Sequence, residues 1–280
     1  MSTEHTYTLA GVMGWPVTHS RSPVIHRHWF AEHHLHGDYV LLPVQSEHLA
    51  TALRGLPALG FAGCNLTIPH KIAALSLVDR VEPLAKSIGA VNTVIVEKDG
   101  SLSGRNTDAE GFIQSLRDAQ PQWRGAQGPA VVIGAGGAAR AVIAGLLNNG
   151  ATEVRVCNRT WDTALELQQD FGPAVQPVAW EQRALALTGS ALLVNTTNQG
   201  MHGQAPLDLT LDALPRDALV ADIVYVPLQT PLLATAAARG NATVNGLGML
   251  INQARLGFQA WTGVLPVNSV ELRSKLLATF

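Results

Sequence analysis

The chain has 280 residues, enough for two domains, and 47% of them are hydrophobic while 14% are charged. Its formal net charge of −2 excludes the basic footprint of a protein that binds nucleic acid or an anionic membrane. The start, residues 1–6, has no basic or apolar leader segment, and no apolar run reaches membrane-spanning length. We therefore expect a cytoplasmic, well-buried globular protein whose partner is a small molecule.

Short apolar runs alternate with helical patterns in the first part of the chain. The expected strands cover residues 7–13, 38–44 and 60–66, and the expected helices cover 23–35 and 47–56. A hairpin follows, with strands at 91–97 and 101–104 around the turn Lys98-Asp99-Gly100. This alternation predicts an α/β domain in which helices cover a mostly parallel sheet.

Two serines follow the first expected strand. Ser20 and Ser22 are two residues apart, so in an extended segment both hydroxyls face one side, where they could bind a hydroxylated or carboxylated ligand. Ser22 has an alternative role as a helix N-cap, since Pro23 follows it. Ser20 has no such alternative.

The strand over residues 60–66 leads into a second polar segment. Thr67 and Lys71 lie near its carboxyl end, which is where open α/β sheets bind ligands. We expect Pro69 to begin a helix with Lys71 in its first turn, where a cation is locally unfavourable. The lysine is therefore a candidate functional group, with a solvent-facing charge as the alternative.

Asn92 and Asp108 have competing structural and functional interpretations. Asn92 is either a polar residue at a strand entry or a ligand contact. A helix is expected over 107–119, where Thr107 and Glu110 form a capping box and Asp108 complements the helix dipole. The same carboxylate could also meet Lys71.

A glycine-rich turn lies in the middle of the chain, after a linker at 121–129. The apolar run Val131 to Ile133 leads into Gly134, and an alanine-rich helix continues to residue 149. In the G-x-G-x-x-A fingerprint, Gly134 makes the tight turn, Gly136 lets backbone approach a pyrophosphate, and Ala139 allows close helix packing. Glycine also collects at such junctions for structural reasons alone.

The next strand, at residues 154–160, supports the dinucleotide interpretation. It ends in Asn158, Arg159 and Thr160, where an NAD-binding protein usually carries an acidic residue and an arginine suits a 2′-phosphate. The alternative is a solvated Arg159 with Thr160 capping the helix at 161–171. The pattern favours NADP.

Further strands are expected at 191–195, 218–224 and 242–244, and further helices at 231–238, 248–261 and 269–277. Polar loops follow two of these strands, at Asn195-Thr196-Thr197 and near Tyr225. Met249 and Gln253 share a helix face, with a core methionine and a solvated glutamine as the alternative.

The cysteine and histidine spacings predict no metal site. Cys64 and Cys157 lie in apolar strand patterns, which indicates buried reduced thiols. His26 and His28 do not share a helix face, and no carboxylate or thiolate has matching spacing.

Taken together, these segments closely resemble the shikimate dehydrogenase family over nearly the whole chain. The resemblance implies substrate contacts at Ser20, Ser22, Thr67, Lys71, Asn92, Asp108 and Gln253, with Tyr225 beside the substrate. It implies cofactor contacts at Gly134, Ala135, Gly136, Gly137, Ala138, Ala139, Asn158, Arg159, Thr160, Asn195, Thr196, Thr197, Val224, Gly246 and Met249. Thr163 replaces a second basic residue that the family often carries, which implies a weaker preference for NADP.

The resemblance also implies an α/β fold of two domains with a cleft between them. The substrate domain would comprise residues 1–106 and 247–280, and the Rossmann-type NADP-binding domain residues 107–246. The implied reaction is the reversible NADPH-dependent reduction of 3-dehydroshikimate to shikimate in chorismate biosynthesis, with the Lys71/Asp108 pair handling the proton. The alternatives are a quinate/shikimate dehydrogenase of broader specificity and a catalytically silent NADP sensor. The protein would be a monomer or a homodimer.

Overall fold

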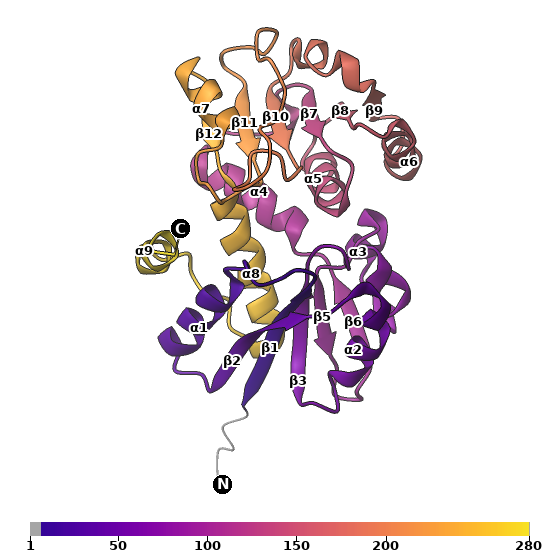
Figure 1. Ribbon diagram of the computed structural model, residues 1–280, viewed down its shortest axis with the longest axis vertical. Helices are drawn as coiled ribbons and strands as arrows, with labels where there is room; N and C mark the ends of the chain where they lie inside the picture. Colours follow the sequence, from indigo (N-terminus) through magenta and orange to yellow (C-terminus); the bar gives the residue numbers. More distant parts are fainter. Residues whose placement is uncertain (1–6, 280) are drawn as a thin grey trace. The chain divides into compact units, whose positions relative to one another are not determined.

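The computed structural model describes residues 7–279, so the start on which the leader expectation rests lies outside the described residues. The chain divides into two compact units, one formed by Met1–Thr107 with Ile251–Phe280 and the other by Asp108–Leu250. Each unit contains one six-stranded sheet with helices around it (Figure 1). No helix among residues 7–279 is long and apolar enough to cross a membrane.

The sheet of the first unit has the strand order β2-β1-β3-β5-β6-β4. These strands are β1 (Thr8–Gly14), β2 (Gly37–Pro43), β3 (Phe61–Leu66), β4 (Arg80–Val81), β5 (Thr93–Val96) and β6 (Leu102–Arg105). β1 pairs in parallel with β2 and β3, whereas β5 runs antiparallel to both β3 and β6. The expected hairpin is therefore confirmed, with Gly100 at a φ of 81° in its turn.

Helices from both ends of the chain belong to this first unit. They are α1 (Ser22–Glu32), α2 (Leu49–Gly55), α3 (Pro83–Ile88) and α9 (Val270–Leu277), together with most of α8 (Gly246–Thr262). The indole Nε1 of Trp261 in α8 donates to the Val94 carbonyl of β5 at 3.0 Å. Phe258 of α8 packs edge-on against Trp29 and Phe30 of α1. The C-terminal helices thus complete the core of the first unit.

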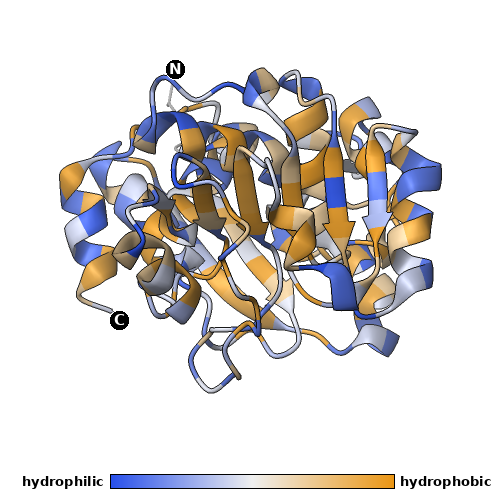
Figure 2. Cartoon of the chain, turned by 90° about the horizontal axis from the view of Figure 1, so that it is seen from above, coloured by the Kyte–Doolittle hydropathy of each residue, from blue (hydrophilic) through white to orange (hydrophobic). Residues whose placement is uncertain are grey.

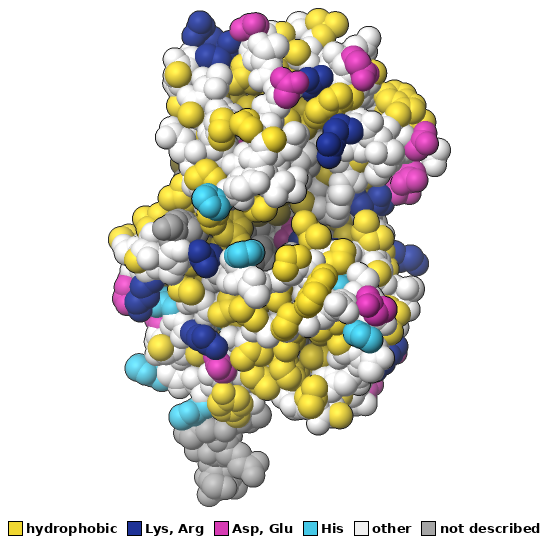
Figure 3. All heavy atoms as spheres, viewed as in Figure 1, with side chains coloured by type: hydrophobic (Ala, Val, Ile, Leu, Met, Phe, Trp, Pro, Cys, Tyr) yellow, Lys and Arg dark blue, Asp and Glu magenta, His cyan; other side chains and the backbone are white. Residues whose placement is uncertain are grey.

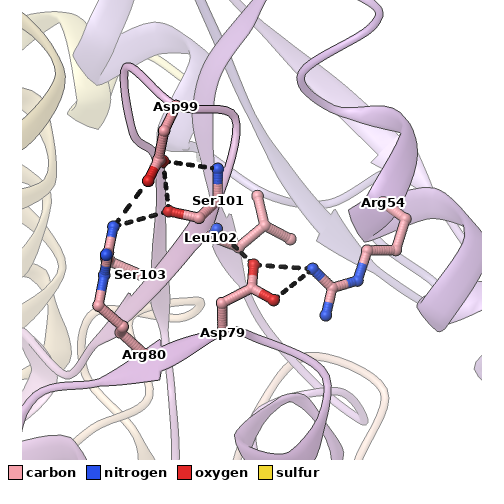
Figure 4. A network of polar contacts seen from close by, with 7 residues as sticks. All are labelled: Arg54, Asp79, Arg80, Asp99, Ser101, Leu102 and Ser103. Carbon is pink, nitrogen blue, oxygen red and sulfur yellow. Dashed lines mark hydrogen bonds and ion pairs between the residues drawn. The ribbon is translucent and has the colours of Figure 1, made fainter.

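A polar network holds the edge of this sheet where β4 meets β6 (Figure 4). The Asp79 carboxylate accepts the Leu102 N–H at 2.8 Å and two bonds from Arg54 Nη1 at 2.8 and 2.7 Å. The Leu102 N–H and then Arg54 lower the pKa of Asp79. Nearby, Arg80 Nη2 donates to Ser101 Oγ at 2.6 Å. These bonds join the short strand β4 to the hairpin.

The second unit contains a sheet in which every pairing is parallel, with the order β12-β11-β10-β7-β8-β9. Its strands are β7 (Ala130–Ile133), β8 (Val154–Cys157), β9 (Val175–Val178), β10 (Leu192–Asn195), β11 (Leu219–Asp222) and β12 (Thr243–Val244). Its helices are α4 (Asp108–Ala119), α5 (Gly137–Asn148), α6 (Trp161–Phe171) and α7 (Pro231–Ala238). The strand order reverses beside β7, which makes the carboxyl end of β7 the switch point where such sheets bind ligands.

The strands in Figure 2 are mostly orange, whereas the helices around them mix orange with blue. All four residues of β7, β10 and β11 are buried, as expected for parallel strands covered on both faces. Charged side chains of both signs are dispersed over the face shown in Figure 3, in keeping with the small net charge. The predicted buried thiols are confirmed, and burial raises the pKa of Cys64 to about 12 and that of Cys157 to about 11.

Two local predictions are wrong. Pro69 does not begin a helix, because the chain forms turns from residue 68 to 72 and a 3-10 helix starts only at Ala73. The His70 N–H donates to the Thr67 carbonyl at 2.8 Å, and the His70 ring Nε2 lies 2.8 Å from the Val44 carbonyl, which fixes this loop against the end of β2. Ser22 is not an N-cap: Arg21 occupies that position, and Ser22 is the first residue of α1.

Candidate active site

Several of the polar residues predicted to bind substrate in the first unit follow β1 and β3 or precede β5, which runs antiparallel to β3. Ser20 lies in the loop after β1, and its hydroxyl accepts the Ser22 N–H at 3.3 Å. Ser22 is buried, with 6% of its surface exposed. Ser20 therefore orders the start of α1, a structural role that the sequence did not predict for it.

Asn92, immediately before β5, is held in one orientation. Its Oδ1 accepts the Thr107 N–H at 2.8 Å and the Thr93 hydroxyl at 2.9 Å, and its Nδ2 donates to the Thr107 hydroxyl at 2.9 Å. Only 2% of Asn92 is exposed. Its second amide proton has no acceptor among residues 7–279 and is free to bond a ligand.

The loop carrying Thr67 and Lys71 is fixed through its main chain. The Thr67 N–H donates to the Met13 carbonyl of β1 at 3.0 Å, and the Lys71 carbonyl accepts the Val91 N–H at 2.8 Å. The loop thus lies beside the segment that carries Asn92. Since no helix begins at Pro69, the predicted helix-dipole cost for Lys71 does not apply.

Asp108 and Gln253 are both buried, with 4% and 9% of their surfaces exposed. Asp108 is the first residue of α4, so the predicted dipole interaction is confirmed. Thr107, which precedes it, is fixed by both the Oδ1 and the Nδ2 of Asn92. The interpretation of Gln253 as a solvated residue is wrong, because α8 packs its side chain away from solvent.

The turn after β7 combines a glycine in a left-handed conformation with a glycine whose backbone faces open space. Gly134 has a φ of +105°, and a Cβ there would lie 2.7 Å from Thr196 Oγ1. Gly136 precedes α5, and a Cβ there would meet nothing within 4 Å. The backbone of this turn and the amino end of α5 therefore present an open surface that fits an anionic pyrophosphate.

A buried network links this turn to the loops after β10 and β11. The Thr196 N–H and hydroxyl donate to the Ile133 carbonyl at 2.9 and 2.7 Å. The neighbouring Asn195 donates to Asp222 at 3.0 Å and accepts the Thr197 hydroxyl at 2.7 Å. These bonds set the position of the Asn195 to Thr197 segment.

Asp222 anchors the two loops, a role that the sequence did not predict. Besides Asn195, it accepts the Val224 N–H at 3.0 Å and the Thr230 hydroxyl at 2.7 Å. Burial raises the pKa of Asp222, and these hydrogen bonds act in the opposite direction. The sequence signal for this role is a single carboxylate at the end of an apolar strand.

At the end of β8, Arg159 is exposed and has no ion pair with any described carboxylate. Asn158 Nδ2 donates to the Thr160 carbonyl at 2.9 Å, which closes the turn that carries Arg159. Thr160 occupies the N-cap position of α6, but its side chain makes no capping bond, so the alternative interpretation of Thr160 is wrong. The guanidinium is available for a 2′-phosphate.

Gly246 and Met249, at the start of α8, lie close to Asp222 and Asn245, with no free space for a water molecule between them. The Gly246 N–H donates to the Val224 carbonyl at 3.0 Å, and a Cβ at Gly246 would lie 2.0 Å from the Ile223 carbonyl oxygen. Met249 also contacts the core of the second unit, so the core interpretation of this residue holds.

The fold and these residues define the class of the protein. One unit presents a dinucleotide turn with a free arginine at the next strand end, and the other presents buried amides and hydroxyls beside a lysine. This combination is typical of a two-unit nicotinamide-dependent dehydrogenase.

Comparison with known proteins gives the family. The Shikimate dehydrogenase substrate binding domain matches residues 12–94, the Shikimate / quinate 5-dehydrogenase domain residues 119–200, and the Shikimate 5'-dehydrogenase C-terminal domain residues 246–267. The chain belongs to the shikimate dehydrogenase family.

Relatives and solved structures agree with this assignment. The shikimate dehydrogenase (NADP(+)) of Paramagnetospirillum magneticum is 55% identical over 96% of this chain and 98% of its own. The Thermus thermophilus enzyme, solved with NADP(H) and shikimate, is 38% identical, with a TM-score of 0.87 over 98% of this chain and 100% of that one. A Corynebacterium glutamicum quinate dehydrogenase solved with NAD is 30% identical, with a TM-score of 0.89 over 97% and 99%.

Proposed function

We propose that this protein catalyses the reversible reduction of 3-dehydroshikimate to shikimate with NADPH. The observation that carries this proposal is the 55% identity to a shikimate dehydrogenase (NADP(+)) over 96% of the chain. The local geometry agrees with this proposal, because the glycine turn after β7 has an open backbone and the buried Asn92 side chain is held in one orientation. Such a reaction occupies a step on the way to chorismate.

The second unit would hold the cofactor. The turn from Gly134 to Ala138 would bind the pyrophosphate, and the segment from Asn158 to Thr160 would bind the 2′-phosphate and the adenosine. Thr196 and Met249 would contact the remaining part of the cofactor. When bound, NADPH supplies the hydride. Arg159 is the charged group that favours NADP over NAD, because it is exposed and an acidic residue is absent from position 158.

The protein itself must supply a proton and orient the ketone. Lys71 is the proposed proton donor to the ketone oxygen in the reducing direction, and Asp108 is its proposed partner. In the reverse direction the same pair would accept the proton from the substrate hydroxyl. Both residues stand in ordered positions, since the Lys71 main chain bonds Val91 and Asp108 opens α4.

Substrate recognition is assigned to the amides and hydroxyls of the first unit, with Tyr225 from the second. The residues are Ser20, Ser22, Thr67, Asn92, Tyr225 and Gln253. A site whose buried polar groups bond substrate hydroxyls can reject an analogue without them by about 10⁴-fold. The fixed amide of Asn92 supports this interpretation, because its free N–H can meet only a hydrogen-bond acceptor.

A broader quinate/shikimate specificity is the second candidate. It is supported by the likeness to the quinate dehydrogenase of Corynebacterium glutamicum, at 30% identity. That protein was solved with NAD, whereas Arg159 here favours NADP. We also propose that the protein acts in the cytoplasm, since its two free thiols suit a reducing compartment, and that it is a monomer or a homodimer.

One absorbance assay of reduced nicotinamide tests the proposal. It crosses shikimate and quinate with NADP⁺ and NAD⁺, and we expect the highest kcat/KM with shikimate and NADP⁺. Lys71→Ala should lower kcat by about 10²- to 10⁴-fold with little change in KM, because general acid–base catalysis contributes about that much.

Lys98→Ala is the matched control, since Lys98 is an exposed residue in the hairpin turn, and it should retain wild-type kinetics. No turnover of shikimate by the wild-type protein would refute the proposed function. Full activity of Lys71→Ala would remove this lysine from the reaction.

A further inference from the structure

Tyr39 is a buried residue of β2 that lies outside the loops named above. None of its surface is exposed. We infer that Tyr39 is a positioning residue that fixes the orientation of the Asn92 side chain, which we propose binds substrate. This inference rests on the proposed function, and it concerns how Asn92 is held.

The phenol of Tyr39 bonds a residue of another strand of the same sheet. Its hydroxyl donates to Asn65 Oδ1 of β3 at 2.6 Å, so its single proton is committed to that amide. Burial raises the pKa of Tyr39, so the phenol stays protonated and remains a donor to Asn65.

From Asn65 the hydrogen bonds continue in one direction to Asn92. Asn65 Nδ2 donates to the Thr93 hydroxyl at 3.0 Å and to the Asn92 carbonyl at 3.2 Å. The Thr93 hydroxyl donates in turn to Asn92 Oδ1 at 2.9 Å. Each group gives its proton to the next, so this chain of bonds fixes which atom of each amide faces which neighbour.

The Tyr39 ring is held independently of its hydroxyl. The His26 ring stacks on it with centroids 4.0 Å apart and planes at 5°. Burial lowers the pKa of His26 to about 3, so this ring is neutral, and neither of its nitrogens has a hydrogen-bond partner among the described residues. Trp261 lies against Tyr39 with ring centroids 6.0 Å apart. A phenylalanine at position 39 would keep these ring contacts and lose only the hydroxyl.

Loss of the hydroxyl would affect the whole chain of bonds. Asn65 Oδ1 would be left buried without its donor, and the Asn65 amide would lose the bond that fixes its orientation toward Thr93 and Asn92. The bound geometry of the substrate would be less well defined, whereas Lys71, which is not a member of this chain of bonds, would still transfer its proton. The consequence is a larger KM for shikimate at a nearly constant kcat.

The test is steady-state kinetics on the full-length Tyr39→Phe protein. We expect KM for shikimate to rise by about 5- to 30-fold, the range of one lost buried hydrogen bond, while kcat changes by less than about 3-fold. KM for NADP⁺ should stay at the wild-type value. Thr262→Val is the matched control, because it removes a hydroxyl that donates to the Phe258 carbonyl in the same unit, at 2.8 Å.

A second variant tests the chain of bonds even if Tyr39→Phe is poorly folded. Thr93→Val interrupts the bonds one step before Asn92, and it should also raise KM for shikimate. In the double variant the two increases should be less than multiplicative, because both changes interrupt one chain of bonds.

An unchanged KM in both single variants, or an equal rise in Thr262→Val, would overturn the inference and leave the proposed function intact. If the wild-type protein neither turns over nor binds shikimate in a calorimetric titration, both proposals are refuted together.

Discussion

His26 shows how one buried residue makes the stability of the first unit depend on pH. In the folded protein burial holds its pKa at about 3, whereas in the unfolded chain it has the ordinary value of 6.5. As the pH falls below 6.5, the unfolded chain binds a proton that the folded protein does not. This residue therefore contributes stability above pH 6.5 that is lost progressively as the pH falls toward 3.

His26→Phe should remove that dependence, because an aromatic ring remains to stack on Tyr39 and no proton can bind. Between pH 6 and pH 4, the free energy of unfolding of the wild-type protein should fall relative to that of the variant. The difference should grow at a rate that approaches about 1.4 kcal/mol per pH unit. Urea unfolding at several pH values measures both curves. Parallel curves would show that His26 does not titrate between the folded and unfolded states as described.

The sequence proposes individual site residues where the residue type itself indicates a chemical role. The lysine near a strand end and the arginine after β8 are candidates of this kind, and they stay predictions. Tyr39 and Asp222 are not, because their roles depend on partners such as Asn65 and Thr230 that tertiary structure brings into contact. A tyrosine in a strand pattern indicates core packing and says nothing of where its hydroxyl points.

The turn between β7 and α5 contains two glycines, Gly134 and Gly136, for which we expect different roles. Gly134 has a φ of +105°, and an added Cβ would lie 2.7 Å from Thr196 Oγ1, whereas the added Cβ of Gly136 would face open space. Gly134→Ala should therefore destabilise the turn, by about 1 kcal/mol or more. Gly136→Ala should leave the melting temperature unchanged.

In NADP⁺ binding we expect the larger effect from the variant at Gly136. A methyl group at Gly136 would occupy the surface that the pyrophosphate approaches, so KM for NADP⁺ should rise while the protein remains fully folded. Thermal unfolding and kinetics of both variants measure this. A destabilised Gly136→Ala, or one with wild-type KM for NADP⁺, would contradict the assignment of this turn.

Elements were predictable where hydrophobic periodicity was sustained. Five of the six strands of the second unit and the hairpin of the first agree with their predicted ranges to within a few residues. The sixth strand, β9, and two short elements of the first unit, β4 and α3, were not predicted, since so few residues carry too little periodicity. The helix expected at Pro69 was wrong for a related reason: a favourable first residue does not make a helix when the loop is fixed by tertiary bonds through His70.

At the scale of the whole molecule, the two units differ in how the chain builds them. The second unit is continuous from Asp108 to Leu250, and its sheet and two hydrophobic clusters lie within that range. The first unit needs two segments, because Phe258 and Trp261 complete the ring cluster around Trp29 and His26. The mid-chain glycine turn predicted two domains, and the family resemblance implied that the C-terminal helices return to the first.

This difference predicts unequal behaviour of fragments. Residues 108–250 alone should unfold cooperatively, and NADP⁺ at 100 times its Kd should raise the free energy of unfolding by about 2.7 kcal/mol. Residues 1–107 alone should aggregate, because without Phe258 they expose Trp29 and Phe30. Joining residues 1–107 to 251–280 through a Gly/Ser linker is the matched control, and it should restore a soluble, cooperatively unfolding protein. Urea titrations followed by circular dichroism measure all three, and a folded 1–107 fragment would show that α8 and α9 are dispensable to the core they complete.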